Sequence, residues 1–507
     1  MKNSMLKCAL VAAVFLALLP TGFAQGSLTP PGPPAPTMKS LDQIEPRTIV
    51  NAVNTPGDAG EMFIISQPGS YYLTTNITAS TAINGITIKA NNVTLDLSGF
   101  AVQGPGTFSS GTAYGIYIPN AQTNLTVRNG SVSGWNGIGG GAGAGVIAKS
   151  VYTVNLLFEH LNISDTGDGI FLFCPCVIRD CTVAHNSSSG IVCSFGLYDS
   201  DASTVTGCTV NENGEVGISI TTGTVSACAA NNNGGGGMVS YDGSVSDCTV
   251  YGNDGFGIYA QEATVSGCGV SYNNLDGIVE SSGTVSDCSV YGNGGEGIDM
   301  SGGTVSGCTS FDNIESGIYG AQTTVVDCTA NNNDNGIFVL NDCVVTGCVA
   351  SGNGTNGITT GTVCKVSDCI ASGNTGLGIV TGDNAQITGC HVNGNTLGGI
   401  KFSNFSLVRE NMVDYQKATT TTPGITMTGN NNRVEGNNIT RCGIGLQATS
   451  TANLILRNSV SGSTGVAYSI VAGNSVGVIV VPTSSGTISG SSGGGIGSTD
   501  PTANFAF

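Results

Sequence analysis

The stretch TVSDCSVYGNGGEGIDMSGGTVSGC, residues 284–308, decides the fold because it contains its own beginning. The motif TVS, one small residue and then Cys returns after twenty residues. The same interval, lengthened twice by one residue, aligns ten cysteines: Cys208, Cys228, Cys248, Cys268, Cys288, Cys308, Cys328, Cys348, Cys369 and Cys390. An asparagine follows each cysteine by five positions: Asn213, Asn233, Asn253, Asn273, Asn293, Asn313, Asn333, Asn353, Asn374 and Asn395. Nine positions after nearly every cysteine, Gly precedes Ile or Met. Three columns in phase indicate copies of one structural unit.

This period predicts a solenoid, in which each coil buries its apolar face against neighbouring copies. Leucine-rich repeats share the period, but they need Leu at fixed places, and these units hold Val, Ile, Thr and Gly. The nonapeptide and hexapeptide periods of calcium-binding β-rolls and left-handed β-helices are absent from the sequence. We therefore predict an all-β fold, a single parallel β-helix with 20–21 residues per central coil.

Alternation of apolar and polar residues predicts which side chains face the interior of a coil. A period of two places Val285, Val290 and Ile298 inside. The three-residue step from Val285 to Cys288 breaks this alternation, and a bend at Asp287 restores it with Cys288 inward. Gly, Ala or Asp occupies that bend in every central coil, which suits a left-handed backbone.

The cysteine column continues in other residues on both sides of the central block. The equivalent positions are Cys181, His160, Gly130 and Phe100 towards the N-terminus, and Asn411, Asn437 and Asn458 towards the C-terminus. The prediction is thus a spine of about 17 coils. Because several residue types share the column, the position requires a residue that fits an inward turn and does not require sulfur.

Five segments are expected along the chain. They are a signal peptide at 1–24, a Pro-rich linker at 25–37, an N-terminal cap at 38–80, the β-helix at 81–480 and a Gly/Ser-rich tail at 481–507. Lys2 and Lys7 precede an apolar run, and small residues around Ala24 follow it. This is the order of regions in a secretory signal. The run is too short for a comfortable membrane span. We therefore expect a secreted or cell-envelope protein without a transmembrane segment.

The charge of the chain excludes one class of partner. Its 33 acidic and 15 basic residues give a net charge of −18. A strongly negative protein is repelled by phosphate backbones, so nucleic acid is not an expected partner.

The segment NGITIKANNVTLDLSGFAVQG, residues 84–104, resembles the first coils of the pectate-lyase-like superfamily of right-handed parallel β-helices. The resemblance covers about residues 60–480 and implies a right-handed coil. The lead-in from TMKSLDQIEPRTIVNAV onwards is similar to that of bacterial exported β-helix repeat proteins, which implies a bacterial host. Enzymes of this superfamily act on acidic polysaccharides from the outward face of one sheet, using paired carboxylates or Arg/Lys with calcium. Their Asn-Thr-Asp, Asp-Asp, Gly-His-Gly and Arg-Ile-Lys motifs are absent from this sequence.

The cysteine column is interpreted as structural. Thiols stacked in a line about 4.8 Å apart cannot converge on one zinc ion at ~2.3 Å. Neighbouring cysteines have a permitted Cα spacing for disulfides, but parallel Cβ vectors at about 4.8 Å exceed the usual range, which favours buried free thiols. Cys343 and Cys364, one coil apart, receive the same interpretation. Cys174, Cys176 and Cys193, near insertions, are better disulfide candidates.

The repeated acids at the bend do not predict a metal site. Asp247, Asp287, Asp327 and Asp368 precede alternate cysteines, so they lie nearly 10 Å apart, too far to share a calcium ion. We expect neither metal nor cofactor.

Catalytic candidates are few. The outward strand position after Gly-Ile supplies one acid and one lysine, Asp299 and Lys401, five coils apart. Ionisable residues gather instead on two adjacent coils, where Glu159 and an inward His160 accompany the candidate residues Asp165, Asp168, Arg179, Asp180 and His185.

Aromatic residues predict a binding face. Tyr241, Tyr259, Tyr319 and Phe338 lie at outward positions, where their rings can stack on sugars. The sequence therefore favours an exported, non-catalytic β-helix for surface display or binding of extracellular polysaccharide. The alternative is a polysaccharide lyase or glycoside hydrolase that uses the residues of the 159–185 region. The sequence gives no indication of the oligomeric state.

Overall fold

The computed structural model describes residues 46–137, 143–193, 202–417, 419–481 and 500–507. The chain separates into two units, Met1–Arg47 and Thr48–Phe507, and the second contains the whole fold described below. The predicted signal peptide and linker, the beginning of the predicted cap and residues 482–499 of the predicted tail lie outside the described residues.

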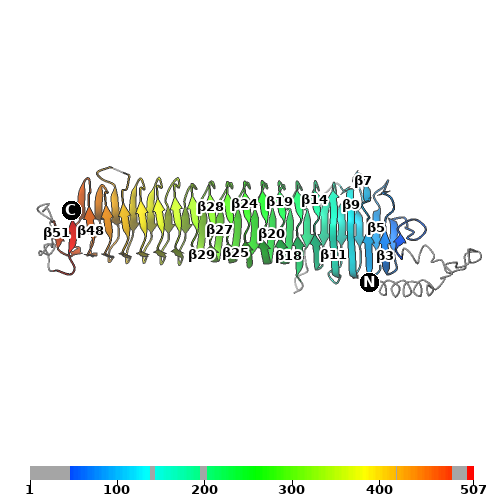
Figure 1. Ribbon diagram of the computed structural model, residues 1–507, viewed down its shortest axis with the longest axis horizontal. Helices are drawn as coiled ribbons and strands as arrows, with labels where there is room; N and C mark the ends of the chain where they lie inside the picture. The colour runs from blue at the N-terminus through cyan, green and yellow to red at the C-terminus, as the bar shows by residue number, and fades with distance from the viewer. Residues whose placement is uncertain (1–45, 138–142, 194–201, 418, 482–499) are drawn as a thin grey trace, which may run out of the picture. The chain divides into compact units, whose positions relative to one another are not determined.

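The second unit is a parallel β-solenoid, as predicted. Its strands pair in parallel with the strands one coil away, and the ribbon shows them stacked side by side from β3 to β48 (Figure 1). The described residues contain no helix, and hence none that is long and apolar enough to cross a membrane.

Each coil contributes to three sheets. The first sheet precedes the cysteine corner and contains β3 (Gly69–Tyr72), β6 (Val93–Asp96), β13 (Cys176–Arg179), β16 (Ser203–Thr206), β18 (Ile218–Ser226), β20 (Met238–Ser246), β23 (Ala263–Ser266), β25 (Ile278–Ser286), β27 (Ile298–Ser306), β29 (Ile318–Val326), β32 (Val344–Thr346), β35 (Lys365–Ser367), β38 (Gln386–Thr388), β41 (Leu407–Arg409), β44 (Arg433–Glu435), β47 (Leu454–Leu456) and β50 (Ser475–Val476), with β1 (Thr48–Ile49) paired to β3.

The second sheet follows the cysteine corner. It contains β4 (Ile77–Thr78), β7 (Ala101–Phe108), β9 (Thr123–Gly137), β11 (Val154–Ser164), β14 (Thr182–Ala184), β17 (Thr209–Asn211), β19 (Ala229–Asn231), β21 (Thr249–Tyr251), β24 (Gly269–Ser271), β26 (Ser289–Tyr291), β28 (Thr309–Phe311), β30 (Thr329–Asn331), β33 (Val349–Ser351), β36 (Ile370–Ser372), β39 (His391–Asn393), β42 (Met412–Asp414), β45 (Asn438–Thr440), β48 (Ser459–Ser461) and β52 (Asn504–Ala506), with β51 (Ile479–Val480) paired to β52. The long strands β9 and β11 also extend into the first sheet.

The third sheet begins at the Gly-Ile pair. It contains β2 (Glu61–Ile65), β5 (Asn84–Ile88), β8 (Ala113–Ile118), β10 (Gly143–Ala148), β12 (Asp168–Leu172), β15 (Ile191–Cys193), β22 (Ile258–Gln261), β31 (Ile337–Val339), β34 (Ile358–Thr360), β37 (Leu377–Thr381), β40 (Gly398–Phe402), β43 (Pro423–Met427), β46 (Ile444–Ala448), β49 (Val466–Ile470) and the first halves of β18, β20, β25, β27 and β29.

The number of coils slightly exceeds the prediction. The described part of the second sheet contains 19 strands, because β4 adds a coil before Phe100 and β52 adds one after Asn458. Strands of the predicted cap region already pair as coils, since β2 pairs with β5 and β3 with β6. The described residues therefore show no clearly separate cap.

One position of the predicted spine is wrong. Leu161 pairs with Gly130 and is buried, so it takes the inward place that the sequence assigned to His160. His160 has a φ of 52° and lies exposed at the bend, like Asp287. The coil before it is about ten residues longer than a central coil, so the twenty-residue interval no longer fixes the register there.

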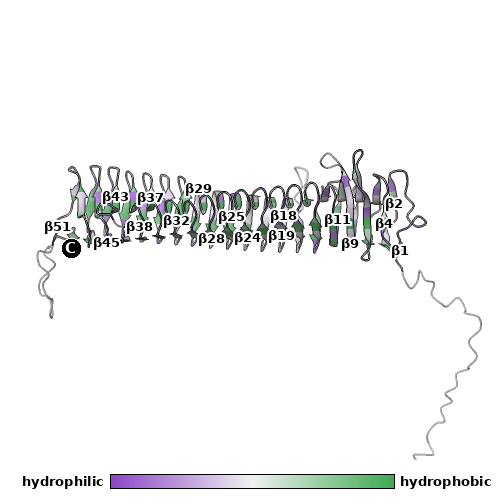
Figure 2. Cartoon of the chain, turned by 90° about the horizontal axis from the view of Figure 1, so that it is seen from above, coloured by the Kyte–Doolittle hydropathy of each residue, from purple (hydrophilic) through white to green (hydrophobic). Residues whose placement is uncertain are grey.

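The interior is apolar, and hydrophobic residues recur in coil after coil (Figure 2). The cysteine column is buried as predicted, and the Cys288 side chain is only 2% exposed. Its thiol lies 3.2 Å from the carbonyl oxygen of Ser286, an acceptor that the bend at Asp287 leaves within reach. The bend itself has a φ of 53°, which confirms the left-handed backbone expected there.

The predicted asparagine column forms a buried ladder that links successive coils. The backbone N–H and the side-chain amide of Asn273 both donate to Oδ1 of Asn293, at 3.1 and 3.0 Å. Asn293 donates in the same way to Asn313. The buried amides of Asn273 and Asn293 are thus satisfied by the coil that follows each of them.

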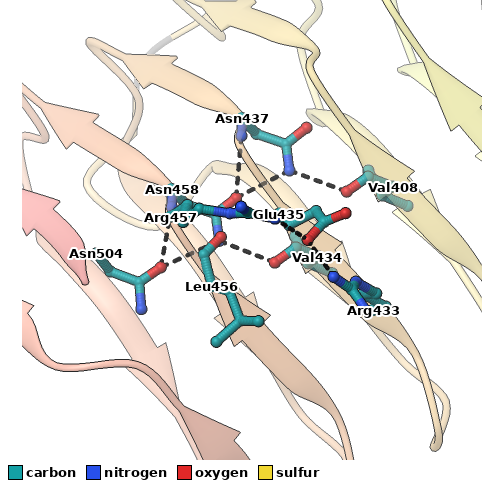
Figure 3. Close-up of polar contacts among 9 residues, drawn as sticks. All are labelled: Val408, Arg433, Val434, Glu435, Asn437, Leu456, Arg457, Asn458 and Asn504. Carbon is teal, nitrogen blue, oxygen red and sulfur yellow. Dashed lines mark hydrogen bonds and ion pairs between the residues drawn. The ribbon is translucent and has the colours of Figure 1, made fainter. Parts of the chain in front are cut away.

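After Cys390, asparagines take over the cysteine column and form a second ladder. The N–H of Cys390 donates to Asn411, and Asn411 donates to Asn437. Asn437 then donates to Asn458, and Asn458 to Asn504 of β52 (Figure 3). The C-terminal strand therefore completes the last coil through the same hydrogen bonds.

We expect Asn293→Ala to destabilise the coils around it by about 2–4 kcal/mol, because both donors of Asn273 would lose their acceptor inside the core. Hydrogen exchange of residues 253–313 measures this loss coil by coil. The matched control is Asn274→Ala, since Asn274 is exposed and its side chain donates to the exposed Asp254. Equal exchange in the two variants would contradict the role of the ladder.

Candidate functional site

The predicted catalytic region at 159–185 forms a ladder of ion pairs on the first sheet. Glu159 accepts two hydrogen bonds from the Arg179 guanidinium, one of them from Nε at 2.8 Å. Arg128 lies between the carboxylates of Asp96, at 3.4 Å, and Glu159, at 3.9 Å. These charges neutralise one another along successive strands. Arg179 is therefore held in an ion pair with Glu159.

The other candidates of this region do not converge. His160 Nε2 lies 3.8 Å from Asp180, and both side chains are exposed. His185 lies 3.1 Å from Glu212 at a different corner of the coil. Asp165 is exposed and bonds to Ser164. It does not take the place of the ladder asparagine, because Thr166 makes the bond to Asn186. The structure therefore pairs His160 with Asp180 and Arg179 with Glu159, but it does not gather the candidate residues of this region into one site.

Asp168 belongs to a different structural feature, the turn position just before the Gly-Ile pair. Its Oδ1 accepts the N–H of Ser189 in the next coil, at 3.3 Å. Burial raises its pKa above the usual value, and hydrogen bonds from Ser188 and Ser189 oppose that rise. Asp276 and Glu296 occupy the same turn position, and each accepts an N–H from the following coil. Acids at the turn position before Gly-Ile therefore accept backbone N–H groups of the next coil, and they can also take part in a site.

The outward positions of the third sheet follow the predicted register. Tyr259 pairs with Val279, Val279 with Asp299, and Asp299 with Tyr319, which pairs with Phe338. The four predicted aromatic residues form two contacts. Tyr241 and Tyr259 meet edge to face at 6.1 Å, whereas the rings of Tyr319 and Phe338 are stacked at 5.8 Å with an angle of 6° between their planes. The stacked pair presents two parallel rings on adjacent coils.

A cavity of about 340 Å³ adjoins this stacked pair. Besides the two rings, its lining consists of Glu296, Glu315, Ser316, Asp334 and Asn335. We call this the Tyr319 site. It combines flat aromatic faces with hydrogen-bond acceptors, an arrangement typical of small polar ligands that also have an apolar face.

Of the acids that line the Tyr319 site, Glu296 has a raised pKa. Burial raises the pKa of Glu296 to about 7, the hydrogen bonds to Ser316 oppose the rise, and Glu315 and Asp276 add to it. Burial also raises the pKa of Asp299, with a contribution from Asp276. Sequence reasoning missed Glu296, Glu315 and Asp334 because they lie in the turn before the strand, where alternation assigns no direction.

A second exposed aromatic row was also missed. Tyr251, Tyr272, Tyr291 and Phe311 are neighbours along the second sheet and its corner, with centroid distances of 5.6, 5.2 and 4.9 Å. The sequence did carry a signal, since the motifs CTVY, CSVY and CTSF repeat an aromatic residue three positions after the cysteine. Gly292 makes room for this row, because a Cβ there would approach the Tyr272 ring to 2.8 Å.

One buried carboxyl lies inside the core. Glu280 is 1% exposed, and its Oε1 accepts the N–H of Ala263 at 3.2 Å. Its Oε2 has no hydrogen-bond partner. Burial raises the pKa of Glu280 to about 7, with the bond from Ala263 opposing the rise.

The described residues contain no group of three or more His, Cys, Asp or Glu that could hold a metal ion. The cysteines outside the central column are buried as well, and Cys176 Sγ lies 3.2 Å from Cys193 Sγ. Burial raises the pKa of Cys174 to about 12, so this thiol is a poor nucleophile at neutral pH.

Comparisons with known proteins agree with this architecture. The family model described as "Right handed beta helix region" matches residues 65–224, 193–264 and 244–363, more than half of the chain. A comparison with curated protein sequences finds no match.

Similar solved structures include the A-module of the mannuronan C-5 epimerase AlgE4 from Azotobacter vinelandii, with 13% identity over 62% of this chain and 87% of that one and a TM-score of 0.33. The Dettilon tailspike protein is 13% identical over 53% of this chain and 62% of its own, with a TM-score of 0.36. The periplasmic alginate epimerase AlgG is 12% identical over 84% of this chain and 83% of its own, with a TM-score of 0.21.

The buried carboxyl of Glu280 predicts that stability falls as the pH rises. Its folded pKa of about 7 exceeds the ordinary 4.5, so the stabilisation is complete below about pH 4.5 and is lost as the pH rises through 7. We expect Glu280→Gln to be more stable than the wild type at pH 8 by about 3 kcal/mol and to show little gain at pH 4.5. Thermal melts at both pH values measure this, with the exposed Glu262→Gln as control. A gain of equal size at both pH values would contradict a titration of Glu280.

Proposed function

Because this chain belongs to the family of right-handed β-helix proteins, we propose that it is a polysaccharide-binding solenoid and has no catalytic activity. In this proposal the protein is exported, and its coils form a regular scaffold that holds aromatic side chains at fixed intervals for an extracellular glycan. The proposal comes from the site itself, since the similarity to epimerases and tailspikes extends to the fold alone.

The observation that carries the proposal is the Tyr319 site. Two parallel rings, 5.8 Å apart, border a cavity whose other walls are carboxylates, an amide and a hydroxyl. The apolar face of a sugar ring stacks on an aromatic ring, while its hydroxyl groups donate to acceptors at the rim. Because Tyr319 and Phe338 come from adjacent parallel strands, a glycan chain that crosses the strands meets both rings in succession.

Two further features support a binding role for the surface. Tyr241 and Tyr259 form a second aromatic pair, with Phe256 in contact with Tyr259 at 5.5 Å. Val279 and Asp299 lie between Tyr259 and Tyr319 on the third sheet. The aromatic row from Tyr251 to Phe311 provides exposed rings on a different face, and Tyr272 is 53% exposed. Exposed aromatic rows of this kind mark binding surfaces more often than single exposed rings do.

A glycoside hydrolase is the second candidate, and Glu296 is the observation that favours it. A carboxyl with a pKa of about 7 is protonated at mildly acidic pH and can act as a general acid, while Glu315 can supply the second carboxylate. The binding proposal is preferred because Glu296 Oε2 already accepts the N–H of Ser316 at 2.5 Å, the same backbone bond that Asp276 makes one coil earlier. In the 159–185 region, Glu159 and Arg179 are occupied by each other.

We expect the purified protein to bind at least one member of a panel of neutral and charged polysaccharides and to leave every one of them uncleaved. Tyr319→Ala should weaken that binding by about tenfold, because it removes a stacking face without opening the core. Affinity gels and calorimetry measure binding, and reducing-end and unsaturated-product assays measure turnover.

The control variant is Tyr152→Ala, which removes a ring that is 77% exposed and lies outside both aromatic rows. Binding lost equally in the two variants would contradict the Tyr319 site. Turnover that disappears in Glu296→Gln would establish the hydrolase instead, and turnover that disappears in Asp168→Ala or Arg179→Ala would locate catalysis in the 159–185 region.

A further inference from the structure

The charges of this chain are separated along the sequence. Residues 180–364 contain 19 Asp and Glu but no Lys or Arg. The chain as a whole has 33 acidic and 15 basic residues, so the remaining segments hold 14 acidic and 15 basic residues and are nearly neutral. The whole net negative charge therefore belongs to the central coils.

The Tyr319 site lies inside this cation-free segment. Glu296, Glu315 and Asp334 line its cavity, and Asp276 and Asp299 adjoin it. Within the described residues, none of these five carboxyl groups forms an ion pair with a basic side chain. The contrast with the N-terminal coils is clear, because Glu159 there has both Arg128 and Arg179 beside it.

Unpaired carboxylates around a binding cavity select ligands by charge. A uronic-acid polymer would bring one more carboxylate to each sugar subsite, and like charges at close range oppose binding. A protonated amino group would instead be attracted by the exposed carboxylates of Glu315 and Asp334. It would also lie over the faces of Tyr319 and Phe338, where a cation is attracted by the ring electrons.

We infer that the Tyr319 site selects polysaccharides with free amino groups, such as polymers of glucosamine, and rejects polymers of uronic acids. The inference rests on the proposed sugar-binding function and adds the chemical class of the glycan. The rings supply the general affinity for sugars, and Glu315 and Asp334 supply the preference for the ammonium group, because both are exposed at the rim.

Calorimetric titration of the full chain with three probes tests this inference. They are a hexamer of glucosamine, its fully N-acetylated counterpart and a hexamer of mannuronate, each at pH 6, where the amines are protonated. We expect the glucosamine hexamer to bind at least about tenfold more tightly than the N-acetylated one, and the mannuronate hexamer to bind most weakly. Raising the salt concentration should reduce the difference in affinity between the glucosamine hexamer and the N-acetylated hexamer, since exposed charges are screened.

The double variant Glu315→Gln with Asp334→Asn should abolish the preference and retain binding of the N-acetylated hexamer. A control of equal charge change, Asp247→Asn with Asp287→Asn, alters exposed acids at the cysteine corner and should keep the preference. Equal affinity for the glucosamine and N-acetylated hexamers, tighter binding of mannuronate, or equal loss of preference in both double variants would overturn the inference. The proposed function would survive those results, because it fails if no glycan binding depends on Tyr319 or if the protein cleaves a glycan.

Discussion

The hydrogen bonds of the buried asparagine ladder are the constraint on which the rest of the structure depends. An amide inside an apolar core must find partners, and each ladder asparagine finds them in the equivalent residue one coil away and in backbone carbonyls of the preceding coil. A coil that slipped by one residue would leave several donors unsatisfied at once. The ladder therefore fixes the register of all three sheets. It passes from Asn395 to Gln416, and a second ladder through Asn437 and Asn458 follows in the cysteine column.

Because the register is fixed, residues at equivalent positions of successive coils lie next to one another in a row on the protein surface. Tyr319 pairs with Phe338 in the third sheet, so the register alone places the two side chains on the same face. The same reasoning applies to the acids. Asp276 and Glu296 gather near the cavity because both cap a backbone N–H of the following coil, and the absence of basic residues from these coils leaves their charge in place.

The sequence predicted the repeat and its inward columns because the period is strict between Cys208 and Cys390. It failed at His160, where a longer coil precedes the residue and the interval of twenty no longer applies. It also missed the cavity acids, since alternation describes strands and Glu296 lies in a turn whose direction is set by hydrogen bonds to the next coil. Alternation places Glu280 inward, but no pattern in the sequence indicates that the core contains a carboxyl there.

The most direct test of this account is the deletion of one whole coil, residues 268–287, compared with the deletion of half a coil, residues 268–277. The first deletion joins Gly267 to Cys288 and leaves every ladder in register, so circular dichroism should show the same β spectrum and a cooperative melt close to that of the full chain. The second deletion removes a corner and a ladder asparagine without restoring the register, and the protein should not fold. Equal loss of structure in both deletions would contradict the claim that the coil, held by its ladder, is the unit of this fold.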